Sequence, residues 1–194
     1  MKILLQTAGK GITECIKGGV VVRLLKKMYE KRTGKPAPYY YEYGLFTIIA
    51  KPMRKWLTNA VAANCPFNCI RIFIYRLCGF EIGKKTFIGM RCYLDDMCYD
   101  LLKIGSNVTI SYGVFFACHG RNQGHTPIVI EDFAYIGMRA SVVSRNPENP
   151  EKGITIGTHS VIGAAALVNR DVPAYATVAG VPCKVIKEVD ANEE

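Results

Sequence analysis

The sequence predicts a mainly β fold, a parallel β-helix, preceded by a basic and mainly α-helical region. Two observations lead to this prediction: an apolar residue recurs at every sixth position in the second half, and the charge changes sharply between the two parts of the chain. A helix presents its apolar face every 3.6 residues and cannot account for a period of six. Strands alternate with period two, so short strands joined by turns every six residues keep equivalent side chains pointing inward.

The repeat consists of four runs of three hexads, and every insertion between runs follows a third hexad. Three strands per coil close a triangle, and each coil buries its apolar side against the next one. The insertions then leave one corner as neighbouring loops, where binding groups are expected. Small residues four positions after the recurring ones, Cys92 and Cys98 among them, are expected to fill the interior. The recurring residues are Ile82, Ile88, Leu94, Ile104, Ile110, Phe116, Ile130, Ile136, Val142, Ile156, Ile162 and Val168.

The charge separates the repeat from what precedes it. The chain of 194 residues has a net charge of +9, but residues 1–80 hold 14 of the 25 Lys and Arg and only 3 of the 16 Asp and Glu. We therefore expect three parts: a basic, mainly helical capping region over 1–80, the β-helix over 81–187 and an acidic tail over 188–194. Helices are expected near 15–32, 54–63 and 67–77. Such a region would cover the open edge of the first coil, which would otherwise pair with other chains.

The end of the repeat has a sequence signature of its own. The hexads are followed by Asn169-Arg170-Asp171-Val172-Pro173 and then by Ala179-Gly180-Val181-Pro182-Cys183-Lys184-Val185-Ile186. With this ending, the segment from Glu81 to Lys187 resembles the hexapeptide-repeat acyltransferases, and among them the sugar and polysaccharide O-acetyltransferases. The resemblance implies a left-handed parallel β-helix, a homotrimer with active sites between subunits, and acetyl-CoA as acyl donor.

Acetyl transfer to a hydroxyl requires a base, and neutral imidazole suits this task near pH 7. His119 lies on the first long corner loop, where similar enzymes hold their base, so we expect His119 to be the general base. His125 on the same loop is the alternative. For the acceptor, the resemblance implies Asp95 and Asp96 at the corner of the preceding coil, with Arg121 and Asn122 beside His119.

For CoA, the resemblance implies backbone groups of the last coils and basic side chains that contact the phosphates. The residues expected to take part are Met138, Ala164, Asn169, Arg170, Lys184 and Lys187. No metal ligands are expected.

Other functions compete with sugar acetylation. A serine-type O-acetyltransferase would use the same base on a small amino alcohol, a γ-carbonic-anhydrase-like enzyme would need three His on zinc, and a trimeric scaffold would need no chemistry.

The basic region would cap the solenoid, contact an anionic membrane or attract a phosphate-bearing, lipid-linked sugar. No nucleic-acid reader motif is present, so nucleic acid is not expected as a partner. Without an export signal or an apolar span, we expect a cytoplasmic protein. The membrane alternative for the basic region would place it at the inner face of the membrane.

Overall fold

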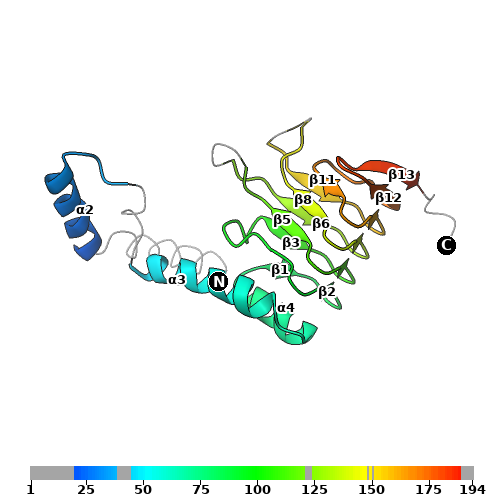
Figure 1. Cartoon of the computed structure of the whole chain (residues 1–194), viewed down its shortest axis with the longest axis horizontal. Coiled ribbons are helices and arrows are strands. Elements are labelled where there is room, and N and C mark those ends of the chain that lie inside the picture. The colour runs from blue at the N-terminus through cyan, green and yellow to red at the C-terminus, as the bar shows by residue number, and fades with distance from the viewer. Residues whose placement is uncertain (1–19, 39–44, 121–123, 148, 150, 189–194) are drawn as a thin grey trace, which may run out of the picture. The chain divides into compact units, whose positions relative to one another are not determined.

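The computed structural model describes residues 20–38, 45–120, 124–147, 149 and 151–188 (Figure 1). The chain divides into two compact units, Met1–Arg54 and Lys55–Glu194, and each is described by itself. The sequence alone suggests a boundary at residue 80. Here residues 55–80 share a unit with the repeat.

The first unit contains α2 (Val20–Thr33) and most of α3 (Leu45–Trp56). Gly34 follows α2 with a φ of +65°, a left-handed conformation that glycine adopts without strain at a helix C-terminus. Lys31 and Arg32 stand in the last turn of α2, where cations interact favourably with the helix dipole. Of the helix expected near 15–32, the described residues from Val20 onward are helical. The helix expected near 54–63 corresponds to the end of α3 and the π-helical η2 (Leu57–Ala62) that follows it.

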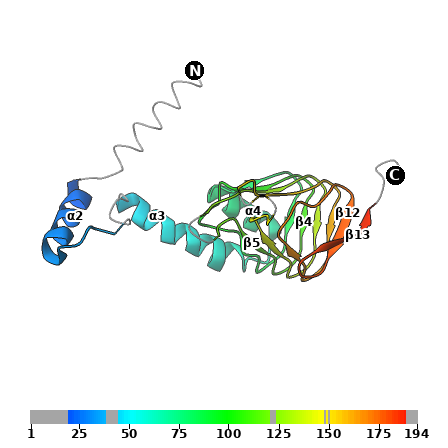
Figure 2. The ribbon, with the colours of Figure 1, turned by 90° about the horizontal axis from the view of Figure 1, so that it is seen from above.

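The second unit is the predicted solenoid of stacked coils (Figures 1 and 2). Its strands form three parallel sheets, one for each side of the triangular coil. An antiparallel strand, β13, closes the C-terminal end by pairing with β12. One side holds β1 (Glu81–Ile82), β3 (Leu102–Ile104), β6 (Ile128–Ile130) and β9 (Ile154–Ile156). The second holds β2 (Phe87–Ile88), β4 (Thr109–Ile110), β7 (Tyr135–Ile136), β10 (Val161–Ile162), β12 (Ala176–Ala179) and β13 (Lys184–Glu188). The third holds β5 (Phe115–Ala117), β8 (Ser141–Val143) and β11 (Leu167–Val168).

The predicted hexad residues stack directly on one another along each side. Ile88, Ile110, Ile136 and Ile162 are register partners on the second side, and each is fully buried. The first and third sides repeat this pattern, with Ile104 paired to Ile130 and Phe116 to Val142. Removing one such side chain from water contributes about 2 kcal/mol, so the ladder is the main source of stability. The prediction of a parallel β-helix with a helical N-terminal region is confirmed.

The turns between strands of one coil have a recurring backbone geometry. At the corner between the first and second sides, Lys85, Asn107, Phe133, His159 and Tyr175 all have φ between 55° and 63°. Left-handed φ costs about 1–2 kcal/mol for an ordinary residue. The same geometry in successive coils shows that the stacking of the coils imposes it.

Two helical segments cover the open edge of the first coil. The π-helical η2 (Leu57–Ala62) packs on α4 (Asn68–Leu77), and α4 packs against β1 and β2 (Figure 1). The guanidinium of Arg71, which is almost fully buried, donates from Nε to the Ile88 carbonyl at 2.6 Å. Asn68 accepts from the Ile88 amide at 3.1 Å and donates to the Thr86 carbonyl at 3.2 Å. Side chains of α4 thus satisfy backbone groups that a further coil would otherwise satisfy. None of the helices described here is long and apolar enough to cross a membrane.

Candidate active site

A hairpin loop carries the predicted base. Following β5, the chain turns at the corner between the third and first sides, and the backbones of His119 and His125 pair in antiparallel fashion. The Thr126 amide donates to the Cys118 carbonyl at 3.0 Å, and the Gly120 amide donates to the Gly124 carbonyl at 2.8 Å. His125 is exposed, whereas His119 is half-buried. The expected residues Arg121 and Asn122 belong to this loop but lie outside the described residues.

A buried carboxylate fixes the imidazole of His119. Oδ2 of Asp95 lies 2.5 Å from Nδ1 of His119 and also accepts the Cys118 amide at 2.8 Å. The other oxygen of Asp95 accepts the Met97 amide at 3.1 Å. An ionised carboxylate can only accept hydrogen bonds, so Nδ1 of His119 is the donor of this pair, and in the neutral form of the ring Nε2 carries the lone pair. The side chain of His119 is 39 % exposed, which leaves room for a reacting group.

The expected contact of Asp95 with an acceptor hydroxyl needs correction. Its side chain has no solvent exposure, and both of its oxygens already have partners within the chain. Asp95 lies at the corner that the sequence suggested, but its carboxylate is buried and contacts His119 instead of facing the solvent.

Asp96 lies in a second polar group beside this pair. Its Oδ1 accepts from the side-chain amide of Asn59 in η2 at 3.2 Å and from the hydroxyl of Tyr93 at 3.4 Å. The ring of Tyr93 stacks on Phe115, with centroids 4.7 Å apart. Burial, together with the charges of Asp95 and Asp96, raises the pKa of Tyr93 well above its ordinary value, so the phenol stays a hydrogen-bond donor at neutral pH.

Loops of the next coils lie against the His119 loop at the same corner, as the insertion pattern predicts. The Ser144 amide donates to the Ala117 carbonyl at 2.9 Å, and the hydroxyls of Ser144 and Thr126 are 2.7 Å apart. The exposed Arg145 follows Ser144 and passes beside Gly120. Asn169 and Arg170 leave this corner one coil further on, because Val168 pairs with Val142. Coils about 4.8 Å apart place them about 10 Å along the prism from His119.

The residues expected to bind CoA fall into two groups. Asn169 and Arg170 share the corner of His119, and Lys184 begins the strand directly after Cys183, whose amide donates to the Leu167 carbonyl. Met138 and Ala164 lie in stacked turns at the corner between the second and third sides, where the Ala165 amide donates to the Met138 carbonyl at 2.8 Å. Arg170, Lys184 and Lys187 are exposed, so their cationic groups are accessible to phosphates.

His159 lies away from the other two histidines. Its ring is stacked between Phe133 and Tyr175, with centroid separations of 4.7 and 5.0 Å, at the corner between the first and second sides. Within the described part of the chain, no three His, Cys, Asp or Glu side chains come together as a metal site would require.

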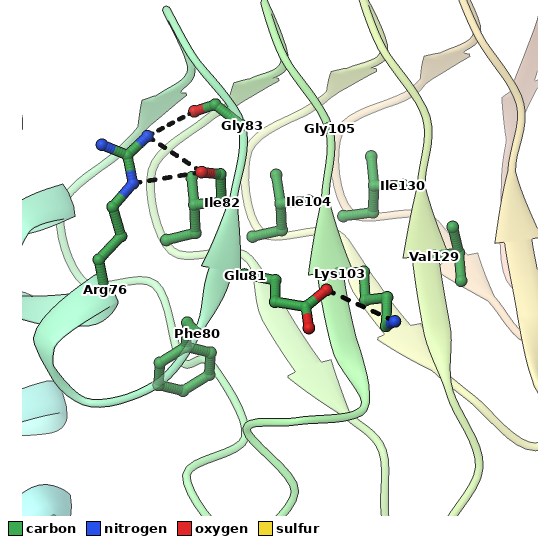
Figure 3. A pocket seen from close by; sticks show the side chains of 10 residues that line it. All are labelled: Arg76, Phe80, Glu81, Ile82, Gly83, Lys103, Ile104, Gly105, Val129 and Ile130. Carbon is green, nitrogen blue, oxygen red and sulfur yellow. Dashed lines mark hydrogen bonds and ion pairs between the residues drawn. The ribbon is translucent and has the colours of Figure 1, made fainter. Parts of the chain in front are cut away.

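A shallow pocket of about 550 Å³ lies elsewhere, on the first side of the solenoid (Figure 3). Arg76 donates to the carbonyls of Ile82 and Gly83 there, and Glu81 pairs with Lys103 at 3.4 Å. The charged groups drawn in Figure 3 therefore have partners within the chain, and His119 is not among the residues that line this pocket.

Sequence reasoning missed Asn59, Tyr93, Ser144 and Arg145. Asn59 is 37 residues from Asp96 in sequence and outside the repeat, so no spacing could indicate their contact. Ser144 and Arg145 could have been found by aligning the third hexads, because they occupy the positions of Cys118 and His119 one coil further on.

Comparison with known proteins gives partial matches. No family model matches the chain. The serine acetyltransferase of Bacillus subtilis is 36 % identical over 110 residues, covering 56 % of this chain and 45 % of the relative. The galactoside O-acetyltransferase of Escherichia coli is 32 % identical over 132 residues, covering 59 % of this chain and 60 % of the relative. The chain thus spans about half the length of the curated relatives it matches.

Solved structures share the fold. A hexapeptide-repeat acetyltransferase from Vibrio cholerae matches with a TM-score of 0.56 at 22 % identity, over 73 % of this chain and 91 % of that one. A maltose O-acetyltransferase from Clostridium difficile matches with a TM-score of 0.53 at 24 % identity, over 75 % of this chain and 89 % of that one. The chain therefore shares the fold of the hexapeptide-repeat acetyltransferases, and over more than half of its length it is similar in sequence to serine and galactoside acetyltransferases.

Proposed function

We propose that the chain transfers an acetyl group from acetyl-CoA to a hydroxyl of a sugar or polysaccharide precursor, with His119 as general base. The hydrogen bond between Asp95 and His119 is the observation that carries this proposal. It presents Nε2 as a proton acceptor on a partly exposed ring, as attack by an alcohol requires. Relatives that include serine, galactoside and maltose O-acetyltransferases support the reaction class.

In the proposed reaction, Nε2 of His119 takes the proton of the acceptor hydroxyl as its oxygen attacks the thioester carbonyl carbon. The carbon–sulfur bond then breaks, and His119 returns the proton to the sulfur of CoA. Asp95 does not contact substrate in this scheme. It holds the tautomer of His119 and stabilises the imidazolium that forms between the two steps.

Acceptor binding is proposed for Asp96, with Arg121 and Asn122 on the same loop as His119. Asp96 keeps one oxygen beyond the contacts of Oδ1 with Asn59 and Tyr93. A carboxylate held in this way accepts a sugar hydroxyl with little reorganisation. The exposed His125 is proposed as a neighbouring contact, and it remains the alternative base.

A homotrimer belongs to the same proposal. The candidate CoA residues occupy two different corners of one prism, so a second copy is needed to bring the Met138 corner to a His119 loop. Arg170, Lys184 and Lys187 supply cations that suit the phosphates of CoA. Acetyl-CoA as donor also favours action in the cytoplasm.

The N-terminal basic region is proposed to meet an anionic membrane or a lipid-linked acceptor. In α2, the exposed Leu24, Leu25 and Met28 are interspersed with Lys26, Lys27 and Lys31. Neutralising Lys26, Lys27, Lys31 and Arg32 together should weaken that encounter and leave CoA affinity unchanged. An equal loss of both would contradict this division of roles.

The reaction is tested by incubating the protein with acetyl-CoA and a panel of sugars and L-serine, and by measuring the CoA released by chromatography. His119→Ala should lose about 10²-fold or more of the turnover while calorimetry still detects CoA binding. His125→Ala tests the alternative base on the same hairpin and should retain most of the turnover if His119 is the base. Full activity of His119→Ala would overturn the assignment of the base, and turnover with serine alone would favour the serine-type alternative.

A further inference from the structure

The outer face of α4 carries a row of exposed apolar side chains. Phe67 immediately precedes the helix, and Ile70, Phe73 and Leu77 follow at spacings that place them along one face. Their exposed fractions are 63 %, 46 %, 65 % and 70 %. Soluble monomers rarely leave so many large apolar groups together in water, and patches of this kind mark an interaction site.

The opposite face of α4 explains why these side chains cannot turn inward. Arg71, Ile72 and Tyr75 occupy the face that covers the first coil, and all three are buried. The hydrogen bonds from Arg71 to the backbone of the coil fix the rotation of the helix. The apolar row is therefore held outward by the same contacts that cap the solenoid.

The segment of the chain that contains the row is basic. Residues 55–85 contain five Lys and Arg and one acidic residue, Glu81, which pairs with Lys103. Arg76 next to Leu77 donates to the carbonyls of Ile82 and Gly83, which keep its full positive charge at this end of the solenoid. Lys84 and Lys85 continue the chain beyond these carbonyls, and both are exposed.

We propose that the α4 surface, made of Phe67, Ile70, Phe73 and Leu77 with Arg76 and Lys84, binds an anionic lipid bilayer. A helix with apolar side chains on one face and cations beside them lies in the interface, with the apolar groups at the acyl boundary and the cations at the headgroups. This inference adds α4 as a surface for the membrane contact that the proposed function describes only for α2. It does not depend on acetyl transfer, because lipid binding is measured without acetyl-CoA.

A second copy of the chain is the main competing occupant, and the charges disfavour it. A two-fold pairing of α4 surfaces places the same patch on both sides of the interface. Arg76 and Lys84 of each copy would then face an equally basic surface, with Glu81 already paired to Lys103. Like charges across an interface oppose association, whereas an anionic bilayer attracts the same groups.

Flotation of the full chain with vesicles tests the inference. Vesicles of phosphatidylcholine with about one third phosphatidylserine should bind the protein, vesicles of phosphatidylcholine alone should bind it poorly, and added salt should weaken the binding. The double variant Phe73→Ser/Leu77→Ser should bind anionic vesicles about tenfold or more weakly. The matched control Val185→Ser/Ile186→Ser removes two exposed apolar side chains on β13 and should bind as the parent does.

Circular dichroism and sedimentation of each variant complete the experiment. The α4 variant should keep its folded spectrum, because both side chains are exposed and outside the cap contacts. Unchanged binding of this variant would overturn the inference and assign lipid contact to another segment such as α2. Failure of the parent chain to bind anionic vesicles would also overturn it. Self-association of the parent chain that is lost in the α4 variant would overturn it as well. Loss of turnover in His119→Ala leaves vesicle binding untouched, so the two proposals can fail separately.

Discussion

Nδ1 of His119 lies 2.5 Å from Oδ2 of Asp95, a carboxylate with no exposure to solvent. The same oxygen accepts the amide of Cys118, the residue before His119, so one buried group fixes both the loop backbone and the imidazole ring. This relationship connects two successive coils at the corner from which the insertion loops leave.

Replacing Asp95 by Asn should lower the turnover number by about 10²-fold or more while the fold is retained. The amide of Asn can donate to Nδ1, which would move the ring proton to Nε2 and remove the proton acceptor. Steady-state CoA release at saturating acetyl-CoA measures the effect. Asp132→Asn is the matched control, because Asp132 also accepts a backbone amide, that of Ser106, but at another corner. Equal losses in both variants would indicate a structural effect instead.

Replacing Asn59 by Ala should raise the KM for the acceptor by about tenfold and change the turnover number less. The variant removes one of two donors to Asp96 and leaves the Asp95–His119 pair in place, so positioning suffers more than proton transfer. Kinetics with the acceptor found in the panel would measure both parameters. Asn64→Ala, in the same segment, should leave both unchanged, since the side-chain amide of Asn64 donates to the backbone carbonyls of Asn59 and Ala60 and not to Asp96. A fall in the turnover number alone would contradict the positioning role.

Replacing Gly137 by Ala should destabilise the solenoid by about 2 kcal/mol. A Cβ at this position would approach the Ala164 amide nitrogen at 2.6 Å and the Ile162 carbonyl oxygen at 2.7 Å, so the next coil would have to move. Chemical denaturation measures the free energy of unfolding. In the control Gly120→Ala, the nearest atom of the described residues to the new Cβ is 3.8 Å away, and the variant should change the free energy of unfolding by about 0.5 kcal/mol or less. Similar losses of free energy of unfolding in the two variants would show that neighbouring coils can move apart to accept a Cβ at residue 137.

Replacing Arg71 by Met should lower the free energy of unfolding by about 3 kcal/mol. The Ile88 carbonyl would lose a buried donor, and the carbonyl of the half-buried Cys65 would lose its bond to the same guanidinium. For a chain of this length, that loss corresponds to a melting temperature lower by about 8 °C. Arg76→Met is the control on the same helix. Its carbonyl partners lie near solvent, so water can replace the guanidinium, and the loss should be about 1 kcal/mol or less. A larger loss of free energy of unfolding in Arg76→Met than in Arg71→Met would contradict the capping role described for α4.

The Cys98 thiol should make stability depend on alkaline pH. Burial raises the pKa of Cys98 from 9.0 to about 11, and the nearby carboxylates of Asp95, Asp100 and Asp96 add to the shift. The unfolded chain therefore releases this proton first as the pH rises. The stabilisation is fully present below pH 9 and is lost as the pH approaches 11.

Denaturant unfolding between pH 8 and pH 11 measures this dependence. The free energy of unfolding should fall less steeply with pH in Cys98→Ala than in the parent chain. Cys69→Ala replaces an exposed cysteine and should leave the slope unchanged. An identical slope in all three proteins would rule out the contribution of Cys98.

Sequence periodicity alone determined the solenoid. In coils built from equal hexads, equivalent residues such as Ile110 and Ile136 have to stack on one another in the interior. The same spacing identified the corner of His119, since insertions after every third hexad have to stack. It also indicated the buried interior positions of Cys92 and Cys98.

The tertiary structure alone decided what the polar groups at that corner contact. Spacing assigned Asp95 to the corner, but only the packing of adjacent coils showed a buried carboxylate directed at His119. The contact between Asn59 and Asp96 joins a helical segment to the repeat, and no local pattern encodes such a distant pairing. The sequence alone also did not show which face of α4 is exposed, because the rotation of the helix depends on the contacts of buried residues such as Arg71. Periodic backbone pairing can be read along a chain, whereas side-chain contacts between non-repeating segments arise only when the chain is folded.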